Sequence, residues 1–280
     1  MQKKSFLENI FGGIRFRLNK LFHNPYRELN IGPVKKVYYK HLSPGEPRIH
    51  RLFGKDLHFI NSTELLHGLK EIFVDEIYKQ ELPPNPYIID CGANIGLSVI
   101  YLKHRHPDAE ILAFEPDEGN FNLLEKNVKS FAFGNVHLHK EAVWIENTTL
   151  QFAGEGSMSS RIDTGASLNT VAVKAVRLKD FLIRPVDFLK IDIEGAEYQV
   201  MMDISDQLHR VNNLFLEYHG SFKQNEELNK LFSLLVEKGF SYYIKEATSV
   251  YPYPFKQVKE GNFNYDVQLN IFCFRLNKAN

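Results

Sequence analysis

The chain has 280 residues, of which 44% are hydrophobic, enough to bury one full domain core and a smaller additional part. Its 34 basic and 34 acidic residues balance, but eleven basic and three acidic residues fall within 1–51, so that segment carries +8 and the remainder −8. Two cysteines are too few for a disulfide scaffold, and no apolar run is long enough for a membrane span. We therefore expect a cytoplasmic protein.

The first 22 residues form an amphipathic pattern. Apolar residues recur at helical spacing from Phe6 to Phe22, with basic residues among them. A basic amphipathic helix is suited to peripheral contact with the inner face of a membrane, and equally to docking on its own domain or on another subunit. Both interpretations stay open. We assign residues 1–80 to this helix and an extension, and residues 81–280 to the main domain.

The extension is expected to contain two short strands and a helix. The strands are predicted at residues 34–39 and 57–60, and a turn-rich link joins them. Ser62 then begins a helix that continues to about Tyr78 along a stripe of apolar residues.

The segment 87–98 predicts a buried strand, a glycine turn and the start of a helix. Asp90 ends the strand, and Gly92 and Gly96 let the backbone turn sharply and approach a ligand closely. Asn94 replaces the middle glycine of a dinucleotide fingerprint, and no P-loop lysine follows. S-adenosyl-L-methionine fits this turn, because a carboxylate attracts its cationic groups and a helix N-terminus can hold its carboxylate. The alternative is a turn whose glycines serve geometry alone.

The next predicted strand, residues 110–115, ends in Glu115, and Pro116 begins the following helix, which runs to about Val128. Glu115 lies 25 residues beyond Asp90, close to the spacing at which a strand-terminal acid meets a ribose diol.

Beyond this helix the pattern departs from plain alternation of strands and helices between residues 148 and 177, and residues 192–197 begin a further helix. Strands are predicted at residues 136–139, 150–152, 171–173, 188–192, 214–220, 242–245 and 269–274, with a helix over 226–238. The glycine- and serine-rich loop 154–161 is compatible both with a lid over a substrate and with a surface hairpin.

Four predicted strands carry acids at their carboxyl ends: Asp90, Glu115, Asp192 and Glu217. In a doubly wound sheet these ends open onto one crevice, and buried acids are rarely unpaired. The pattern therefore predicts an α/β protein with a shared acidic crevice.

Four motifs together resemble the FkbM family of S-adenosylmethionine-dependent methyltransferases. They are Asp-Cys-Gly-Ala-Asn-Ile-Gly at 90–96, Ala-Phe-Glu-Pro at 113–116, Lys-Ile-Asp-Ile-Glu-Gly-Ala-Glu at 190–197 and Leu-Glu-Tyr-His at 216–219. The resemblance covers residues 87–220 and implies a Rossmann-like seven-stranded sheet, mostly parallel with the last strand antiparallel. It also implies O-methylation, often of a sugar hydroxyl in a glycan, glycolipid or natural product.

Carried onto this chain, the resemblance implies a cofactor site. The turn would line the methionine part of S-adenosyl-L-methionine, Glu115 would take the ribose hydroxyls, and residues 141–142 would lie near the adenine. The expected cofactor-binding residues are Asp90, Gly92, Ala93, Asn94, Gly96, Glu115, Pro116, Glu141 and Ala142.

Methyl transfer to a hydroxyl requires a group that accepts the hydroxyl proton. Asp192 and His219 are the candidates for this base, and Glu194 and Glu217 could orient the histidine. His219 could instead be a hydrogen-bonding scaffold, or the acids could hold a divalent cation; no ligand spacing specifies a metal, so none is assigned. Glu197 is expected only to cap its helix or to be solvated. The aromatic residues between 251 and 265 could stack on a sugar or cover core.

Two other function classes are weighed. A nucleic-acid methyltransferase would need a basic face around the crevice, whereas the part of the chain beyond residue 51 is net acidic. We therefore expect a small-molecule or glycan acceptor and no nucleic acid. The remaining alternatives are a non-catalytic Rossmann-like subunit that binds a cofactor or partner, and a methyltransferase for another acceptor class. The sequence does not specify the acceptor or the oligomeric state.

Overall fold

The computed structural model describes residues 26–153, 161–162, 170–259, 261 and 263–276. The helix predicted for residues 1–22 and most of the loop 154–161 lie outside the described residues. The chain divides into two units, one ending at Ile77 and the other beginning at Tyr78, and each is described by itself. Among the described helices, none combines the length and apolar character that crossing a bilayer requires.

The N-terminal unit differs from its prediction at residues 34–39. These residues lie in helix α2 (Pro33–Lys40), so the predicted strand is wrong. Pro33 occupies the start of the helix, where its fixed φ is favourable and its missing N–H costs nothing. Val34 and Val37 are exposed, and Tyr39 is the only buried residue of this helix. The apolar residues of this segment therefore do not form the buried face of a strand.

The second predicted strand of this unit is confirmed as β2 (Lys55–Phe59), and it pairs antiparallel with β1 (Arg48–Leu52), which was not predicted. Helix α3 (Ser62–Gly68) begins where expected, because the Asn61 side chain accepts hydrogen bonds from the first backbone N–H groups. It continues only as a π-helical turn, η1 (Leu69–Val74), and ends before Tyr78. Glu76 has a left-handed backbone (φ 48°), which is incompatible with a continuing helix.

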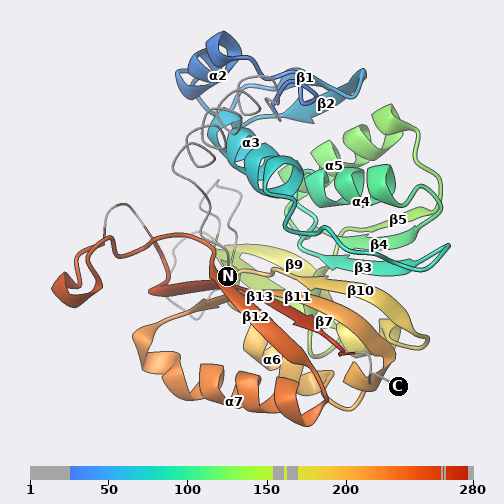
Figure 1. Ribbon diagram of the computed structural model, residues 1–280, viewed down its shortest axis with the longest axis vertical. Coiled ribbons are helices and arrows are strands. Elements are labelled where there is room, and N and C mark those ends of the chain that lie inside the picture. Colours follow the sequence, from blue (N-terminus) through green and yellow to red (C-terminus); the bar gives the residue numbers. More distant parts are fainter. Residues whose placement is uncertain (1–25, 154–160, 163–169, 260, 262, 277–280) are drawn as a thin grey trace, which may run out of the picture. The chain divides into compact units, whose positions relative to one another are not determined.

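The larger unit contains a seven-stranded sheet in the order β12-β13-β11-β10-β3-β4-β5 (Figure 1). Five neighbouring strands are parallel, and β13 lies antiparallel between β11 and β12. This confirms the Rossmann-like α/β sheet with an antiparallel last strand. The strands are β3 (Tyr87–Cys91), β4 (Glu110–Phe114), β5 (Val136–His139), β10 (Val186–Ile191), β11 (Val211–Gly220), β12 (Ser241–Glu246) and β13 (Val267–Phe274).

A smaller sheet accompanies the large one in the order β6-β9-β7-β8. Its strands are β6 (Ala142–Trp144), β7 (Thr148–Ala153), β8 (Arg161–Ile162) and β9 (Thr170–Arg177). The strands predicted at residues 150–152 and 171–173 are confirmed, and they pair with each other, since Leu150 lies opposite Val173 in an antiparallel ladder. Strand β6 was not predicted, because three residues are too few to show a strand period.

Helices cover both faces of the seven-stranded sheet (Figure 1). Helices α4 (Leu97–Arg105) and α5 (Glu118–Phe131) lie on one face, and α6 (Glu197–Asp203) and α7 (Asn225–Glu237) on the other. Short 3-10 turns complete the unit: η2 (Leu178–Phe181), η3 (Leu208–Arg210), η4 (Phe222–Gln224) and η5 (Pro254–Lys256).

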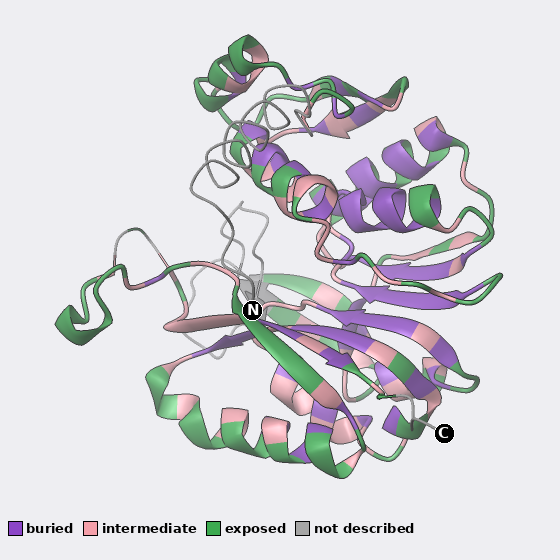
Figure 2. Cartoon of the chain, viewed as in Figure 1, coloured by how far each residue is buried: buried purple, intermediate pink, exposed green. Residues whose placement is uncertain are grey.

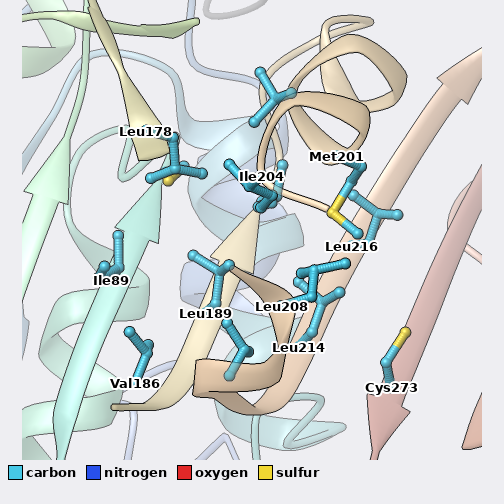
Figure 3. Close-up of a cluster of buried hydrophobic side chains, with 14 of the residues drawn as sticks. Ile89, Leu178, Val186, Leu189, Met201, Ile204, Leu208, Leu214, Leu216 and Cys273 are labelled. Atoms are coloured by element: carbon cyan, nitrogen blue, oxygen red, sulfur yellow. The ribbon is translucent and has the colours of Figure 1, made fainter. Parts of the chain in front are cut away.

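The main core lies between the sheet and the α6/α7 layer. Ile89, Leu189 and Leu216 from three strands pack with Met201 of α6, and none of these side chains is exposed (Figure 3). Figure 2 shows the same pattern, with the central strands buried and the outer surface of α7 largely exposed.

Candidate active site

The glycine turn after β3 is shaped by contacts within the protein. Gly92 has φ 87°, and a Cβ atom on it would lie 1.8 Å from the carbonyl oxygen of Asp192. Gly96 has φ 90°, and its Cβ would lie 2.7 Å from Leu124 of α5. The sequence predicted that these glycines let the backbone approach a ligand. In the structure both positions accommodate the close approach of other parts of the chain, so packing alone requires glycine there.

The Asp90 side chain lies in the interior of the protein beside the glycine turn, and not in an open crevice. It is completely buried, and one carboxylate oxygen accepts a 2.5 Å hydrogen bond from Ser98. The Lys190 ammonium lies 3.2 Å from the other Asp90 oxygen and 3.2 Å from Asp192, and it donates to the Gly92 carbonyl at 2.9 Å. Asp90 therefore has no exposed surface in this structure, and its expected contact with the cofactor stays a prediction. It joins the turn to the ends of β3 and β10.

Lys190 was missed by the sequence analysis. Burial disfavours its charge, but the charges of Asp90 and Asp192 outweigh burial and raise the pKa of Lys190 well above its usual value. The signal was present, because a lysine within a strand that is buried on both faces requires nearby acids.

Glu115 joins the ends of β3 and β4. Only 6% of the residue is exposed. One carboxylate oxygen accepts the N–H of Asn94 at 2.8 Å and the other accepts the N–H of Asp117 at 2.9 Å. Burial raises the pKa of Glu115 to about 7, against the lowering effect of these two hydrogen bonds. The partly exposed Pro116 follows it.

The remaining residues expected at the cofactor are placed less favourably for ligand contact. Ala93 is 1% exposed and Ala142 is 3% exposed, so both belong to the core. Glu141 forms ion pairs with Lys174 at 2.9 Å and with His139 at 3.5 Å.

The structure brings the four expected catalytic residues together after β10 and on β11. The His219 Nε2 atom lies 3.5 Å from Glu217 and 3.9 Å from Glu194. One carboxylate oxygen of Asp192, one of Glu194 and one ring nitrogen of His219 all lie within 4.8 Å of one another. The three carboxylates are partly exposed, whereas the His219 side chain is only 4% exposed. We call Asp192, Glu194, Glu217 and His219 the acidic cluster.

Burial and neighbouring charges shift the pKa values of two residues of the acidic cluster. Burial lowers the pKa of His219, but the charge of Glu197 and hydrogen bonds with Glu197 and Glu217 outweigh it, so this pKa lies well above 6.5. These interactions favour the imidazolium form of His219. For Glu194, burial and then the charges of Asp192, Glu197 and Glu217 raise the pKa to about 7, against the opposing charge of His219.

Glu197 is a second residue whose position sequence reasoning missed. The expectation that it is solvated is wrong, because the residue has no exposed surface. Its carboxylate accepts a 3.0 Å hydrogen bond from the Nδ1 atom of His219. The motif at 190–197 contains this acid, but sequence alone does not show that its side chain turns inward.

Tyr265 covers one side of the acidic cluster. Its hydroxyl donates a 2.6 Å hydrogen bond to the Glu194 carbonyl, and its ring centroid lies 5.0 Å from that of His219. The adjacent Asp266 fixes this segment by accepting from Tyr251 at 2.6 Å, while Tyr253 and Phe255 are exposed.

The glycine turn and the acidic cluster share the carboxyl edge of one doubly wound sheet, joined by Lys190. This combination is typical of Rossmann-like α/β enzymes that bind a ligand at that edge. Residues 90–242 match the model of the Methyltransferase FkbM domain. The match spans more than half of the chain, and the chain belongs to this family of methyltransferases.

Three curated proteins illustrate the relationship. Methyltransferase 1 of Beauveria bassiana (strain ARSEF 2860) is 28% identical over 207 residues, which are 64% of this chain and 81% of that protein. The 31-O-demethyl-FK506 methyltransferase FkbM of Streptomyces tacrolimicus is 25% identical over 230 residues, which are 67% of this chain and 86% of that protein. The hexuronic acid methyltransferase AglP of Haloferax volcanii (strain ATCC 29605) is 23% identical over 167 residues, which are 55% of this chain and 64% of that protein.

Proposed function

We propose that this methyltransferase transfers the methyl group of S-adenosyl-L-methionine to a hydroxyl oxygen, and that the acceptor is a sugar in a glycan, glycolipid or natural product. The acidic cluster beside the glycine turn carries the proposal, because carboxylates can accept hydrogen bonds from several hydroxyls at once. Two relatives support parts of this proposal: the hexuronic acid methyltransferase supports a sugar acceptor, and the 31-O-demethyl-FK506 methyltransferase supports methylation of an oxygen.

The residues at the turn suit the cofactor. Helix α4 begins at Leu97 without a side-chain cap, so its first-turn N–H groups are suited to a carboxylate such as that of methionine. Glu115 would accept hydrogen bonds from the ribose hydroxyls, and the excess of carboxylates would favour a positive charge nearby. When bound, S-adenosyl-L-methionine supplies an electrophilic methyl group. Adenine contact by residues 141–142 stays a proposal.

The proton of the acceptor hydroxyl must move to the protein as the oxygen becomes a nucleophile. The raised pKa of His219 favours its protonated form, which makes this residue less suited to accept that proton. Glu194 has a pKa of about 7 and a partly exposed side chain, which suits a general base at neutral pH. We assign proton acceptance to Glu194, orientation of the sugar hydroxyls to Asp192 and Glu217, and orientation of Glu194 to His219.

The proposal is tested in two stages. Calorimetric titration should detect S-adenosyl-L-methionine binding, and a mass-spectrometric screen of sugar glycosides should find a product heavier by one methylene group. Asp192→Asn should reduce turnover while leaving cofactor affinity within a few fold, and the exposed Glu237→Gln should change neither. Binding without methylation of any hydroxyl acceptor would favour the non-catalytic subunit. Absence of binding would contradict the cofactor assignment.

A further inference from the structure

Glu197 is an acid at the start of a helix that is nonetheless completely buried. As the first residue of α6 it would normally lie in solvent near the helix N-terminus. One carboxylate oxygen accepts hydrogen bonds from the N–H of Ile193 at 3.2 Å and of Gly195 at 3.0 Å, and the other oxygen also accepts from Gly195 at 3.0 Å. The first oxygen accepts from His219 Nδ1 as well. Both oxygens therefore act as acceptors, as in an ionised carboxylate.

The bonds from Ile193 and Gly195 hold the backbone on both sides of Glu194. Glu194 has φ 55°, a left-handed conformation that is unfavourable for a residue with a side chain. Tyr265 secures the same segment through its hydrogen bond to the Glu194 carbonyl. This conformation directs Glu194 into the acidic cluster, and Glu197 provides the acceptor for both flanking amides.

The bond from His219 fixes which ring nitrogen faces the cluster. An ionised carboxylate can only accept, so Nδ1 carries the hydrogen and Nε2 faces Glu194 and Glu217. The charged or titratable groups facing this ring come from four elements: Glu197 of α6, Asp192 and Glu194 after β10, Glu217 of β11, and Tyr265 before β13. Glu197, at 3.0 Å, is the nearest carboxylate.

We infer that Glu197 is a positioning residue that holds Glu194 and His219 together in the geometry required for proton transfer from the acceptor hydroxyl. The inference rests on the proposed function for its catalytic consequence. The structural part of the inference does not depend on the acceptor. It says that a single buried carboxylate sets both the Glu194 backbone conformation and the His219 tautomer. Glu197 touches neither the substrate nor the transferred methyl group and acts only through its two neighbours.

The test compares Glu197→Gln with Glu226→Gln, which changes an exposed acid in the first turn of α7. Histidine ring ¹⁵N spectra of the full chain, with the His219 signal assigned by His219→Gln, report the protonation of each ring nitrogen. In the wild type and in Glu226→Gln we expect His219 to carry hydrogens on both nitrogens at pH 7.5. In Glu197→Gln we expect the His219 pKa to fall by at least about one unit. Turnover should fall at least about tenfold, with S-adenosyl-L-methionine affinity unchanged within about twofold.

Two results would overturn the inference: a folded Glu197→Gln protein whose His219 titrates as in the wild type, or a wild-type His219 whose only ring hydrogen is on Nε2. The wild-type spectrum decides the question even if Glu197→Gln does not fold. The spectra require no acceptor, so a failed methylation screen would contradict the proposed function without deciding this point. Conversely, normal His219 titration in an active Glu197→Gln enzyme would contradict only the positioning role.

Discussion

The ammonium group of Lys190 lies 3.2 Å from the carboxylate of Asp90, and both side chains are buried inside the sheet. The pair links neighbouring strands β10 and β3, and the same ammonium group reaches Asp192 at the carboxyl edge. The glycine turn and the acidic cluster are thereby connected through one cation. Removing that cation leaves a buried carboxylate without its counter-charge, which is far more costly than losing a surface ion pair.

Lys190→Met should therefore lower the free energy of unfolding by about 3–5 kcal/mol, measured by urea denaturation. Lys238→Met, which removes a surface partner of Glu237, should cost less than about 1 kcal/mol. The double variant Lys190→Met/Asp90→Asn should recover part of the loss, because it no longer buries that unpaired charge. Equal stability of Lys190→Met and the wild type would contradict the assigned role.

Gly92→Ala should prevent cooperative folding of the larger unit. The added Cβ would overlap the Asp192 carbonyl oxygen at 1.8 Å, and neither backbone segment can move without breaking the ladder between β3 and β10. Gly239→Ala is the matched control, because Gly239 also has a positive φ (80°) but its Cβ would meet only the side chain of Arg275. The control should cost about 1–2 kcal/mol for the left-handed backbone alone. Similar thermal unfolding of both variants would refute the packing explanation.

The affinity for S-adenosyl-L-methionine should increase with pH around neutrality. The pKa of Glu115 is raised to about 7, so the carboxyl is mostly protonated at pH 6 and mostly ionised at pH 8. Because the ionised form accepts hydrogen bonds from a ribose diol better, the dissociation constant should fall up to roughly tenfold over this range. Glu115→Gln should bind more weakly and lose this pH dependence. Calorimetry in matched buffers measures both effects, and identical pH dependence in the two proteins would exclude Glu115 as the titrating group.

Raised carboxyl pKa values also make the protein less stable as pH rises. Glu115 and Glu194 both have pKa values of about 7 in the folded protein. Protonation of either carboxyl therefore stabilises the folded state relative to the unfolded state. Their contribution to stability is fully present below the unfolded-state pKa near 4.5 and is lost as pH rises through 7. Glu194→Gln should flatten the decline of thermal stability between pH 5 and pH 8. A decline as steep as in the wild type would show that Glu194 does not titrate in this range.

We expect the turnover rate of the wild type to fall as pH drops below about 7, because Glu194 becomes protonated. Glu194→Gln should remove this acidic limb of the pH–rate profile and lower kcat by about 10²–10⁴-fold, with the KM for the cofactor unchanged. The measurement is a pH–rate profile with the acceptor found in the screen. A persisting acidic limb in the variant would assign proton acceptance to another group.

The local structure of the larger unit was predictable because each element has its own period or turn signal. Apolar runs bounded by glycine and proline gave the strands, and the glycine turn with four strand-terminal acids predicted an α/β sheet with a shared edge. The helix at 33–40 was missed because its valines and tyrosines resemble a strand while being mostly exposed.

Sequence alone determined which residues collect at the carboxyl edge: the acids at 90, 115, 192 and 217 and the histidine at 219 each lie near or just after the end of a recognisable strand. Only the tertiary structure decided what each one faces. Asp90 turns inward to Lys190, Glu197 turns inward to His219, and the glycines face protein backbone and an α5 side chain. The reason is physical: a strand's period fixes the alternation of its side chains, but their partners and pKa values depend on which strands, distant in sequence, become neighbours in the sheet.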